Sequence, residues 1–111
     1  MNHNLVMEHE RIDDLQCKGL RLIQDPKGFC FGIDAVLLSN FCEIKRNWKV
    51  IDLGTGTGII PVLLAGKTDA QEIIGVEIQK EVAQMAARSV QLNHLEHRVK
   101  IIHEDLNNIL N

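Results

Sequence analysis

Residues 50–65, which read VIDLGTGTGIIPVLLA, constrain the fold of this chain more than any other stretch. A short apolar run contains Asp52 near its end, three glycines follow at alternate positions, and a second apolar run begins at once. Turns this tight need positive φ angles, which only glycine adopts at little cost. Pro61 is tolerated in the first turn of a helix, because its missing N–H would have no partner there. The stretch therefore predicts a buried strand at 49–53, a glycine turn, and a helix at 58–67.

The same alternation repeats along the rest of the chain. Apolar patterns predict strands at 72–78 and 98–105 and a helix at 80–95 between them. The helix is expected to end near Asn93 or His94 and to bury Val82, Met85, Ala86, Ser89, Val90 and Leu92. Nearly continuous apolar strands separated by helices indicate parallel βαβ units, whose right-handed crossovers give the strand order 3-2-1. The expected fold class is α/β, a partial Rossmann-like fold.

The residues before the first of these strands predict a smaller segment. The alternation in GLRLIQ, the aromatic run FCFG and the turn Asp25-Pro26-Lys27-Gly28 between them predict a β-hairpin over 19–32. Asp34 can cap a short helix with an apolar face, which we expect over 34–44. The domain organisation predicted is thus a segment at 1–48 followed by the first half of a ligand-binding domain at 49–111.

Composition excludes several other classes of protein. A chain of 111 residues with 45% hydrophobic and 24% charged residues is typical of one soluble globular domain. The longest apolar stretch, at 59–65, is far shorter than the ~20 residues of a membrane span. The three cysteines form no CxxC pair, which favours a reducing cytoplasm. A net charge of −3 gives no overall attraction to nucleic acid, and the one basic cluster is the KRNWK segment at 45–49.

An acidic residue stands at the end of each predicted parallel strand: Asp52, Glu77 and Asp105. Ligands of open α/β sheets bind outside the carboxyl ends of the strands, so these carboxylates are expected to gather around one site. Each also has a purely structural explanation, as a solvated loop residue or a helix cap. His94 and His97 lack a third ligand nearby, and no metal site is expected.

The glycine spacing narrows the choice of ligand. A phosphate-binding P-loop needs a lysine that this stretch lacks, and the dinucleotide fingerprint G-x-G-x-x-G finds Ile59 at its third glycine. Asp52, two residues before Gly54, would repel a pyrophosphate but suits a cation. S-adenosylmethionine carries a sulfonium and an ammonium. Asp52 can offset this positive end, Glu77 can accept hydrogen bonds from the paired ribose hydroxyls, and Asp105 can accept one from the adenine amino group.

These motifs resemble a known family. The segments VIDLGTGTGIIPVLLA, GVEIQKEVAQMAARSVQLN and RVKIIHED are similar to the cofactor-binding half of the Rossmann-like S-adenosylmethionine-dependent methyltransferases. The N-terminal RIDDLQCKGLRLIQDPKGFCFGIDAVLLSNF is similar to the opening of bacterial tRNA (adenine-N6)-methyltransferases of the "methyltransferase small domain" type. The resemblance implies N6-methylation of an adenine in tRNA, with these cofactor-binding residues: Phe31, Asp34, Asp52, Gly54, Thr55, Gly56, Gly58, Glu77, Ile78, Asp105 and Leu106.

One departure from the family limits this expectation. The family's Asn/Asp-Pro-Pro-Tyr/Phe motif, which holds the target amino group after the fourth strand, has no match, because the only prolines are Pro26 and Pro61. We therefore expect no catalytic residue here, an N-terminal half of a longer enzyme that is inactive alone, and possible association through an exposed sheet edge. The alternatives are methylation of rRNA or of protein glutamine, a dinucleotide-binding oxidoreductase domain, and a non-catalytic binding module.

Overall fold

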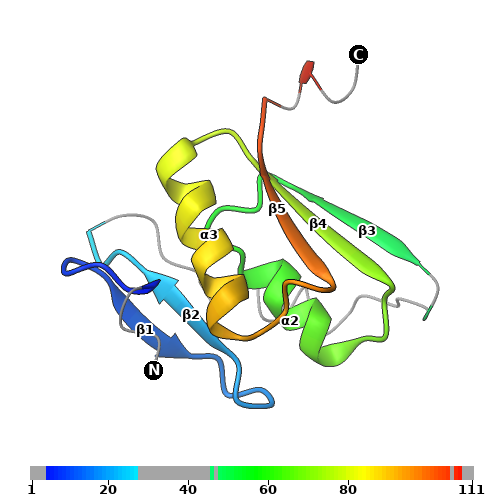
Figure 1. The fold of residues 1–111 in the computed structure, drawn as a ribbon, viewed down its shortest axis with the longest axis horizontal. Helices are drawn as coiled ribbons and strands as arrows, with labels where there is room; N and C mark the ends of the chain where they lie inside the picture. The colour runs from blue at the N-terminus through cyan, green and yellow to red at the C-terminus, as the bar shows by residue number, and fades with distance from the viewer. Residues whose placement is uncertain (1–4, 28–45, 47, 106, 109–111) are drawn as a thin grey trace.

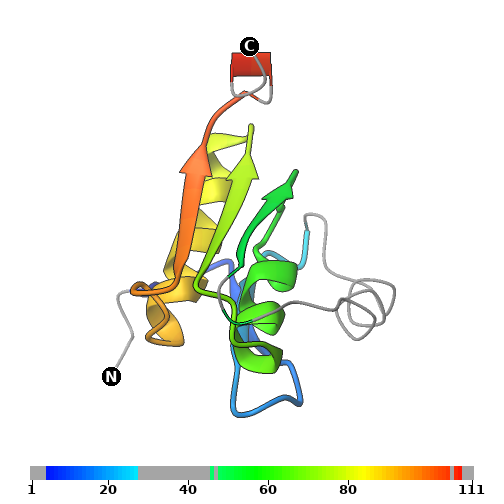
Figure 2. The ribbon, with the colours of Figure 1, turned by 90° about the vertical axis from the view of Figure 1, so that its right-hand side faces the viewer.

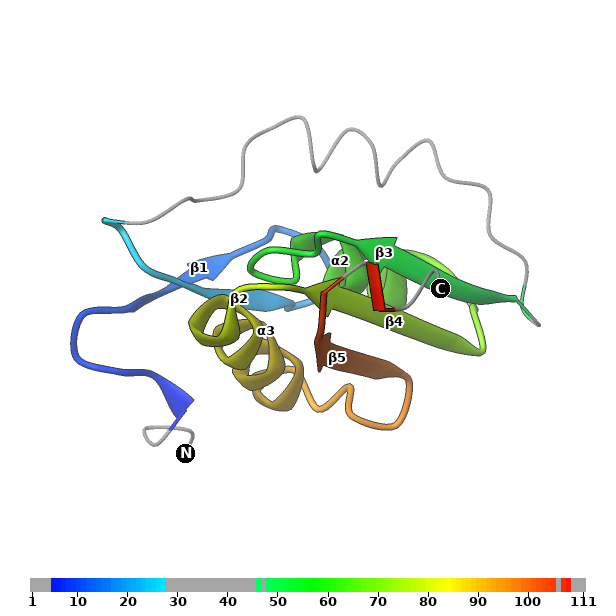
Figure 3. The same cartoon turned by 90° about the horizontal axis from the view of Figure 1, so that it is seen from above.

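The computed structural model describes residues 5–27, 46, 48–105 and 107–108. The described elements form three layers, with the helices between a two-stranded hairpin and a parallel sheet (Figures 1 and 3). In chain order they are β1 (Arg11–Asp14), β2 (Arg21–Gln24), β3 (Lys49–Leu53), α2 (Ile59–Lys67), β4 (Glu72–Glu77), α3 (Lys80–Leu92) and β5 (Val99–His103). Within the described ranges, no helix is long and apolar enough to cross a membrane.

The parallel sheet has the predicted strand order. Strand β4 pairs in parallel with β3 on one side and with β5 on the other, so the order is β3-β4-β5. Figure 2 shows the three strands pointing the same way, with the turn at 107–108 beyond their carboxyl ends. The register sets Val50, Ile73 and Val99 side by side, and this row packs against the helices. The sheet therefore brings the three strand ends together at one edge.

The opposite face of the sheet carries exposed apolar side chains. Ile51, Leu53 and Ile102 are 56%, 47% and 41% exposed, and the register places them on the face that the helices leave open. Nothing in the part of the chain that the structure describes covers this face. Burying apolar area of this kind is favourable, so the face is a candidate surface for further contacts.

The two helices differ in how they bury their side chains. Helix α2 is buried along most of its length, with Pro61 in its first turn as predicted. Helix α3 is amphipathic and buries the predicted Met85, Ala86, Ser89, Val90 and Leu92. Val82 is only partly buried and Ala83 is buried in its place, so the prediction for Val82 was wrong. The helix ends as predicted, with Asn93 as its C-cap and His94 at a φ of 57°.

Strand β2 forms a hairpin that the sequence analysis did not predict. It pairs antiparallel with β1, which precedes it. The connecting turn closes through a bond from the Leu15 amide to the Leu20 carbonyl, with Gly19 at a φ of 72°. The alternation pattern missed β1 because its sequence, RIDD, contains a single apolar residue. Residues 29–32 and the helix predicted at 34–44 lie outside the described residues.

Strand β2 is the centre of the contact between hairpin and helices. Leu22, Ile23 and Gln24 are all almost completely buried. Leu22 packs with Val62 and Leu63 of α2, while Ile23 packs with Met85 and Leu92 of α3. Successive side chains of a strand point to opposite faces, which is how neighbouring residues of one short strand contact two different helices. The hairpin is thus part of the hydrophobic core.

Candidate functional site

The glycine turn lies directly over the end of strand β4. Gly54, Gly56 and Gly58 have φ angles of 71°, 57° and 87°, all in the left-handed region. The amides of Gly54 and Thr55 both donate to the carbonyl of Val76, each at 2.9 Å. Side chains other than hydrogen would strain all three glycine positions, so the local sequence specifies this turn.

Thr55 is fixed beneath the turn by a glycine that the sequence analysis did not single out. The residue is 4% exposed, and a Cβ added at Gly75 would lie 2.8 Å from the Thr55 Oγ1. Gly75 therefore leaves the space that Thr55 fills. An isolated glycine inside the apolar strand EIIGVEI is itself a signal of close approach by another group.

Asp52 interacts with this buried threonine. The Thr55 hydroxyl donates to Oδ2 of Asp52 at 2.8 Å. Burial raises the pKa of the Asp52 carboxyl, and the hydrogen bond from Thr55 partly opposes that shift. The described contacts thus give the carboxylate a hydroxyl partner, and burial leaves its ionised form less stable than in water. Electrostatically, such a group favours a nearby positive charge.

Glu77 connects the glycine turn to the beginning of helix α3. It ends strand β4 with its side chain buried, at 7% exposure for the residue. Its Oε1 accepts from the Gly56 amide at 2.8 Å, and its Oε2 accepts from the Gln79 amide at 3.1 Å. A carboxylate has about four acceptor positions, so both oxygens retain capacity for a ligand's hydroxyl groups. The same side chain therefore holds the turn in place and remains available for binding.

Two pockets meet at Gly54 and Glu77, which line both of them. The smaller, of about 220 Å³, lies over the ends of β4 and β5 and is also lined by Val76, Ile78, Glu104 and Asp105. Ile78 is 57% exposed and offers an apolar surface at its mouth. Asp105 is half-buried, and its Oδ1 accepts from the Asn107 amide at 2.8 Å. The structure thus brings together Gly54, Glu77, Ile78 and Asp105 from the predicted set.

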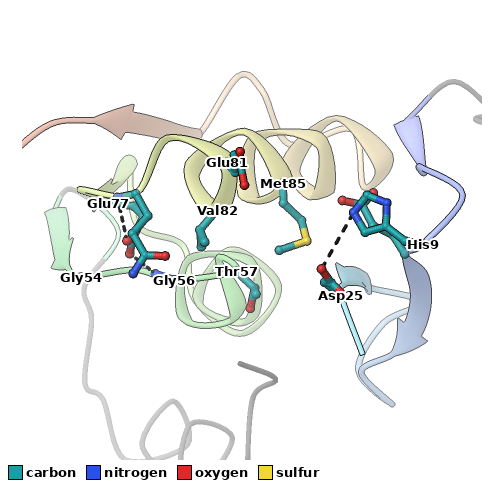
Figure 4. Close-up of a pocket in the computed structure, with 11 residues that line it drawn as sticks. His9, Asp25, Gly54, Gly56, Thr57, Glu77, Glu81, Val82 and Met85 are labelled. Atoms are coloured by element: carbon teal, nitrogen blue, oxygen red, sulfur yellow. Dashed lines mark hydrogen bonds and ion pairs between the residues drawn. The ribbon is translucent and has the colours of Figure 1, made fainter. Parts of the chain in front are cut away.

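The larger pocket, of about 410 Å³, lies between the glycine turn, helix α3 and the hairpin (Figure 4). It is lined by Gly54, Gly56, Thr57, Glu77, Gln79, Glu81, Val82 and Met85, and by His9, Glu10 and Asp25. The sequence analysis missed the last three, because nothing in their local sequence indicates that the hairpin folds over the glycine turn. Four carboxylates and no lysine or arginine line this pocket among the described residues, and one of the four, Glu10, is paired with Arg88 behind the lining. The lining favours a positively charged ligand over a phosphate.

Other predicted site residues lie away from these pockets or outside the described part. Asp52, Thr55 and Gly58 line neither pocket; they support the turn from below. Gly58 also packs against α3, since a Cβ there would be 3.2 Å from that of Ala86. The three remaining predicted residues, Phe31, Asp34 and Leu106, lie outside the described residues.

Comparisons with known proteins agree with this architecture. A family model described as ribosomal protein L11 methyltransferase (PrmA) matches residues 34–110. Over 90 residues the chain is 28% identical to a Tolumonas auensis protein named tRNA1(Val) (adenine(37)-N6)-methyltransferase, covering 80% of this chain and 38% of that protein. The chain thus spans about two fifths of the length of such curated relatives.

Solved structures show the same fold. Methanocaldococcus jannaschii Trm5 in complex with adenosine superposes with a TM-score of 0.72 at 20% identity, covering 90% of this chain and 31% of Trm5. P. horikoshii TYW2 in complex with MeSAdo gives a TM-score of 0.73 at 17% identity, covering 89% and 37%. At these identities the likeness establishes the Rossmann-like arrangement of strands and helices, and the site rests on the residues described above.

Proposed function

The chain belongs to the ribosomal protein L11 methyltransferase (PrmA) family, and we propose that it supplies the S-adenosylmethionine-binding part of a methyltransferase. The observation that carries the proposal is the buried Glu77 carboxylate, which is bonded to the glycine turn and faces both pockets. When bound, S-adenosylmethionine supplies an activated methyl group on its sulfonium.

The residues around Glu77 fit an adenosyl group. The free acceptor positions of Glu77 suit the paired ribose hydroxyls, and the exposed Ile78 offers an apolar surface for the base. Asp105 stands across the smaller pocket and can accept from the adenine amino group. Asp52 lines neither pocket, but its carboxyl, with its raised pKa, favours a positive charge nearby without contacting the ligand. This chain's own contribution is to bind and orient the methyl donor.

The same residues argue against a dinucleotide. A pyrophosphate at the glycine turn would lie beside Glu77, in a pocket that Glu81 and Asp25 also line. These negative charges would repel it, and the dinucleotide fingerprint already fails at Ile59. The oxidoreductase alternative is therefore disfavoured.

For the methyl acceptor we propose an adenine amino group of tRNA. The support is the name shared by curated relatives that match 74–86% of this chain at 26–29% identity. Protein glutamine and rRNA are the alternatives. The Pro-Pro motif expected to hold the target is absent from the sequence, so we propose that these residues bind cofactor without catalysing transfer alone. We also propose that the N-terminal segment ends at residue 48 and that the cofactor-binding part begins at residue 49. The protein is proposed to be cytoplasmic and to associate through the edge of strand β3.

Calorimetric titration with S-adenosylhomocysteine and with NAD tests the cofactor. We expect the homocysteine product to bind and NAD to bind at least tenfold more weakly. Glu77→Gln removes the charge and part of the acceptor capacity, and should weaken S-adenosylhomocysteine by roughly tenfold, the loss of one charge-assisted hydrogen bond. Glu72→Gln, at the opposite end of the same strand, is the matched control and should change nothing.

Two results would contradict the proposal. Tighter binding of NAD than of S-adenosylhomocysteine would support the alternative of a dinucleotide-binding oxidoreductase domain. Sustained methyl transfer by these 111 residues to unmodified tRNA would refute the expected inactivity. Incubating the chain with labelled S-adenosylmethionine and tRNA, and counting methyl groups on adenine, measures the second outcome directly.

A further inference from the structure

Strand β5 ends in a histidine that lines neither pocket but contacts a residue that lines the smaller one. His103 is the last residue of β5, and its Nε2 lies 2.9 Å from the carbonyl oxygen of Ile78. A carbonyl oxygen only accepts, so Nε2 carries the proton and donates it. Ile78 lines the smaller pocket and is 57% exposed. The cofactor-binding residues proposed above do not include His103.

The alternation of side chains along β5 explains why His103 reaches this loop. Val99 and Ile101 face the helices and pack with the apolar cluster between the sheet and the helices. Side chains two residues apart lie on the same face of a strand, so His103 also belongs to the helix-facing side. Here strand β4 has ended and α3 begins at Lys80, so the imidazole meets the loop between β4 and α3.

Two consecutive carbonyls at the end of β4 are held from the end of β5. The backbone amide of Glu104 donates to the Glu77 carbonyl at 3.0 Å, and the His103 side chain donates to the next carbonyl, that of Ile78. The first bond continues the parallel pairing of the two strands, in which Glu77 stands beside His103. The second bond extends this link by one residue, as far as the apolar side chain at the pocket.

The wall of the smaller pocket across from Ile78 is fixed by its own short-range bonds. Glu104 Oε1 accepts from the Asp105 amide at 3.0 Å and from the Asn108 side chain at 2.7 Å. Asp105 Oδ1 accepts from the Asn107 amide at 2.8 Å. These bonds join neighbours in the sequence and do not reach the loop before α3. The two bonds from the end of β5 therefore hold that loop at a set distance from this wall.

We propose that His103 is a positioning residue for the adenine base. By holding the Ile78 carbonyl, it sets the separation between the apolar surface of Ile78 and the carboxylate of Asp105. This inference rests on the proposed function, which places the base in the smaller pocket, and adds a residue that acts without contacting the ligand. A loop already held in its binding conformation loses less freedom when the ligand binds, so the bond from His103 raises the affinity for the base.

Two variants at position 103 separate the hydrogen bond from the ring. His103→Phe keeps the ring and loses the N–H, whereas His103→Gln keeps a side-chain N–H at a similar reach. Adenosine is the probe, because it is the part of the cofactor assigned to the smaller pocket. In calorimetric titration we expect His103→Phe to bind adenosine roughly three- to tenfold more weakly, the loss of about one hydrogen bond, and His103→Gln to stay within about twofold of the unaltered chain.

His97→Phe is the matched control. His97 is exposed and precedes β5, at the end of the strand away from both pockets, so the same replacement there should leave the affinity for adenosine unchanged. The unfolding midpoints in urea of His103→Phe and His97→Phe should agree, because both histidines are exposed. A difference in affinity between these two variants is then an effect on the pocket and not on the stability of the fold.

The outcomes separate this inference from the proposed function. If the unaltered chain binds neither adenosine nor S-adenosylhomocysteine, the proposed function fails and the inference fails with it. If the unaltered chain binds adenosine and His103→Phe binds it equally well, His103 has no positioning role. Equal weakening by His103→Phe and His103→Gln would also overturn the role, because the hydrogen bond would not be the cause. If His103→Phe does not fold, His103→Asn, polar but too short to reach Ile78, takes its place in the comparison with His103→Gln.

Discussion

Asp52 and Glu10 are both carboxylates at the edge of the interior, yet their surroundings act on them in opposite ways. Glu10 meets the Arg88 guanidinium, whose hydrogen bonds lower the pKa of its carboxyl. Asp52 has the neutral hydroxyl of Thr55, and burial raises the pKa of its carboxyl. The hairpin thus contains a charge that is already balanced, while the glycine region contains one that is not. A charge left unbalanced inside a fold is typical of a binding site, where a ligand supplies the partner.

The two regions are also held together differently. In the glycine region, backbone angles and bonds between neighbouring strand ends fix the turn. The N-terminal segment and hairpin are held by side chains of α3 that form hydrogen bonds with residues 66 to 83 positions earlier in the sequence. A single substitution in the glycine region should therefore destabilise the fold through backbone strain. A substitution in the hairpin should do so only where it removes a hydrogen-bond partner of α3.

The largest expected effect compares two glycines with left-handed backbones, Gly58 in the turn and Gly19 in the hairpin. A Cβ at Gly58 would be 3.2 Å from that of Ala86, whereas a Cβ at Gly19 meets nothing within 4 Å. Gly58→Ala should cost about 3 kcal/mol of unfolding free energy, from backbone strain and overpacking together, and Gly19→Ala about 1–2 kcal/mol from strain alone. Urea unfolding measures both. Equal losses would show that the contact with Ala86 contributes nothing.

Next in size is the loss of a buried hydrogen bond between hairpin and helix. Ser89→Ala leaves the Ile23 amide without its partner in the interior, which should cost about 1–3 kcal/mol. Gln91→Ala, at an exposed position of the same helix, is the control and should stay within about 0.5 kcal/mol. Comparable unfolding midpoints in urea for the two variants would mean that the bond between Ser89 and Ile23 does not stabilise the packing of the hairpin on α3.

A smaller effect is expected on the pH dependence of stability through Glu10. Its pKa is lower in the folded chain than the usual 4.5, so its contribution is complete above that value and is lost as pH falls through the folded pKa. Arg88→Gln should flatten the fall in unfolding free energy on acidification. The exposed Glu104 has a lowered pKa through its bond with Asn108 and adds a slope of the same sign, so the comparison is best made in a Glu104→Gln background.

The opposite sign is expected for Asp52, with the smallest effect. Its pKa is raised above the usual 3.8, so stability is greatest below that value and declines as pH rises through the folded pKa. Asp52→Asn should remove this decline and, at neutral pH, leave the unfolding free energy unchanged or higher while weakening S-adenosylmethionine binding. If Asp52→Asn loses stability at pH 7 but not at pH 3, the ionised Asp52 carboxylate is stabilising. That result would contradict the conclusion that Asp52, unlike Glu10, has an unbalanced charge.

The parallel half of the fold could be predicted because its signals are local. Continuous apolar runs gave β3, β4 and β5 within two residues of their ends, and right-handed crossover fixed their order. The hairpin partner was missed because β1 is stabilised by pairing with β2 and has almost no apolar pattern of its own. Val82 was misassigned because a pocket, which periodicity does not reveal, lies beside it.

The sequence by itself determined the glycine turn and the acids at the strand ends, because left-handed φ angles and the geometry of parallel strands leave few alternatives for those residues. Only the tertiary structure decided that Glu77 bonds to the turn it faces, that Gly75 makes room for Thr55, and that the hairpin forms a second wall. These relationships join residues far apart in the chain. They depend on which surfaces pack together, and packing follows from the shape and burial of the whole molecule.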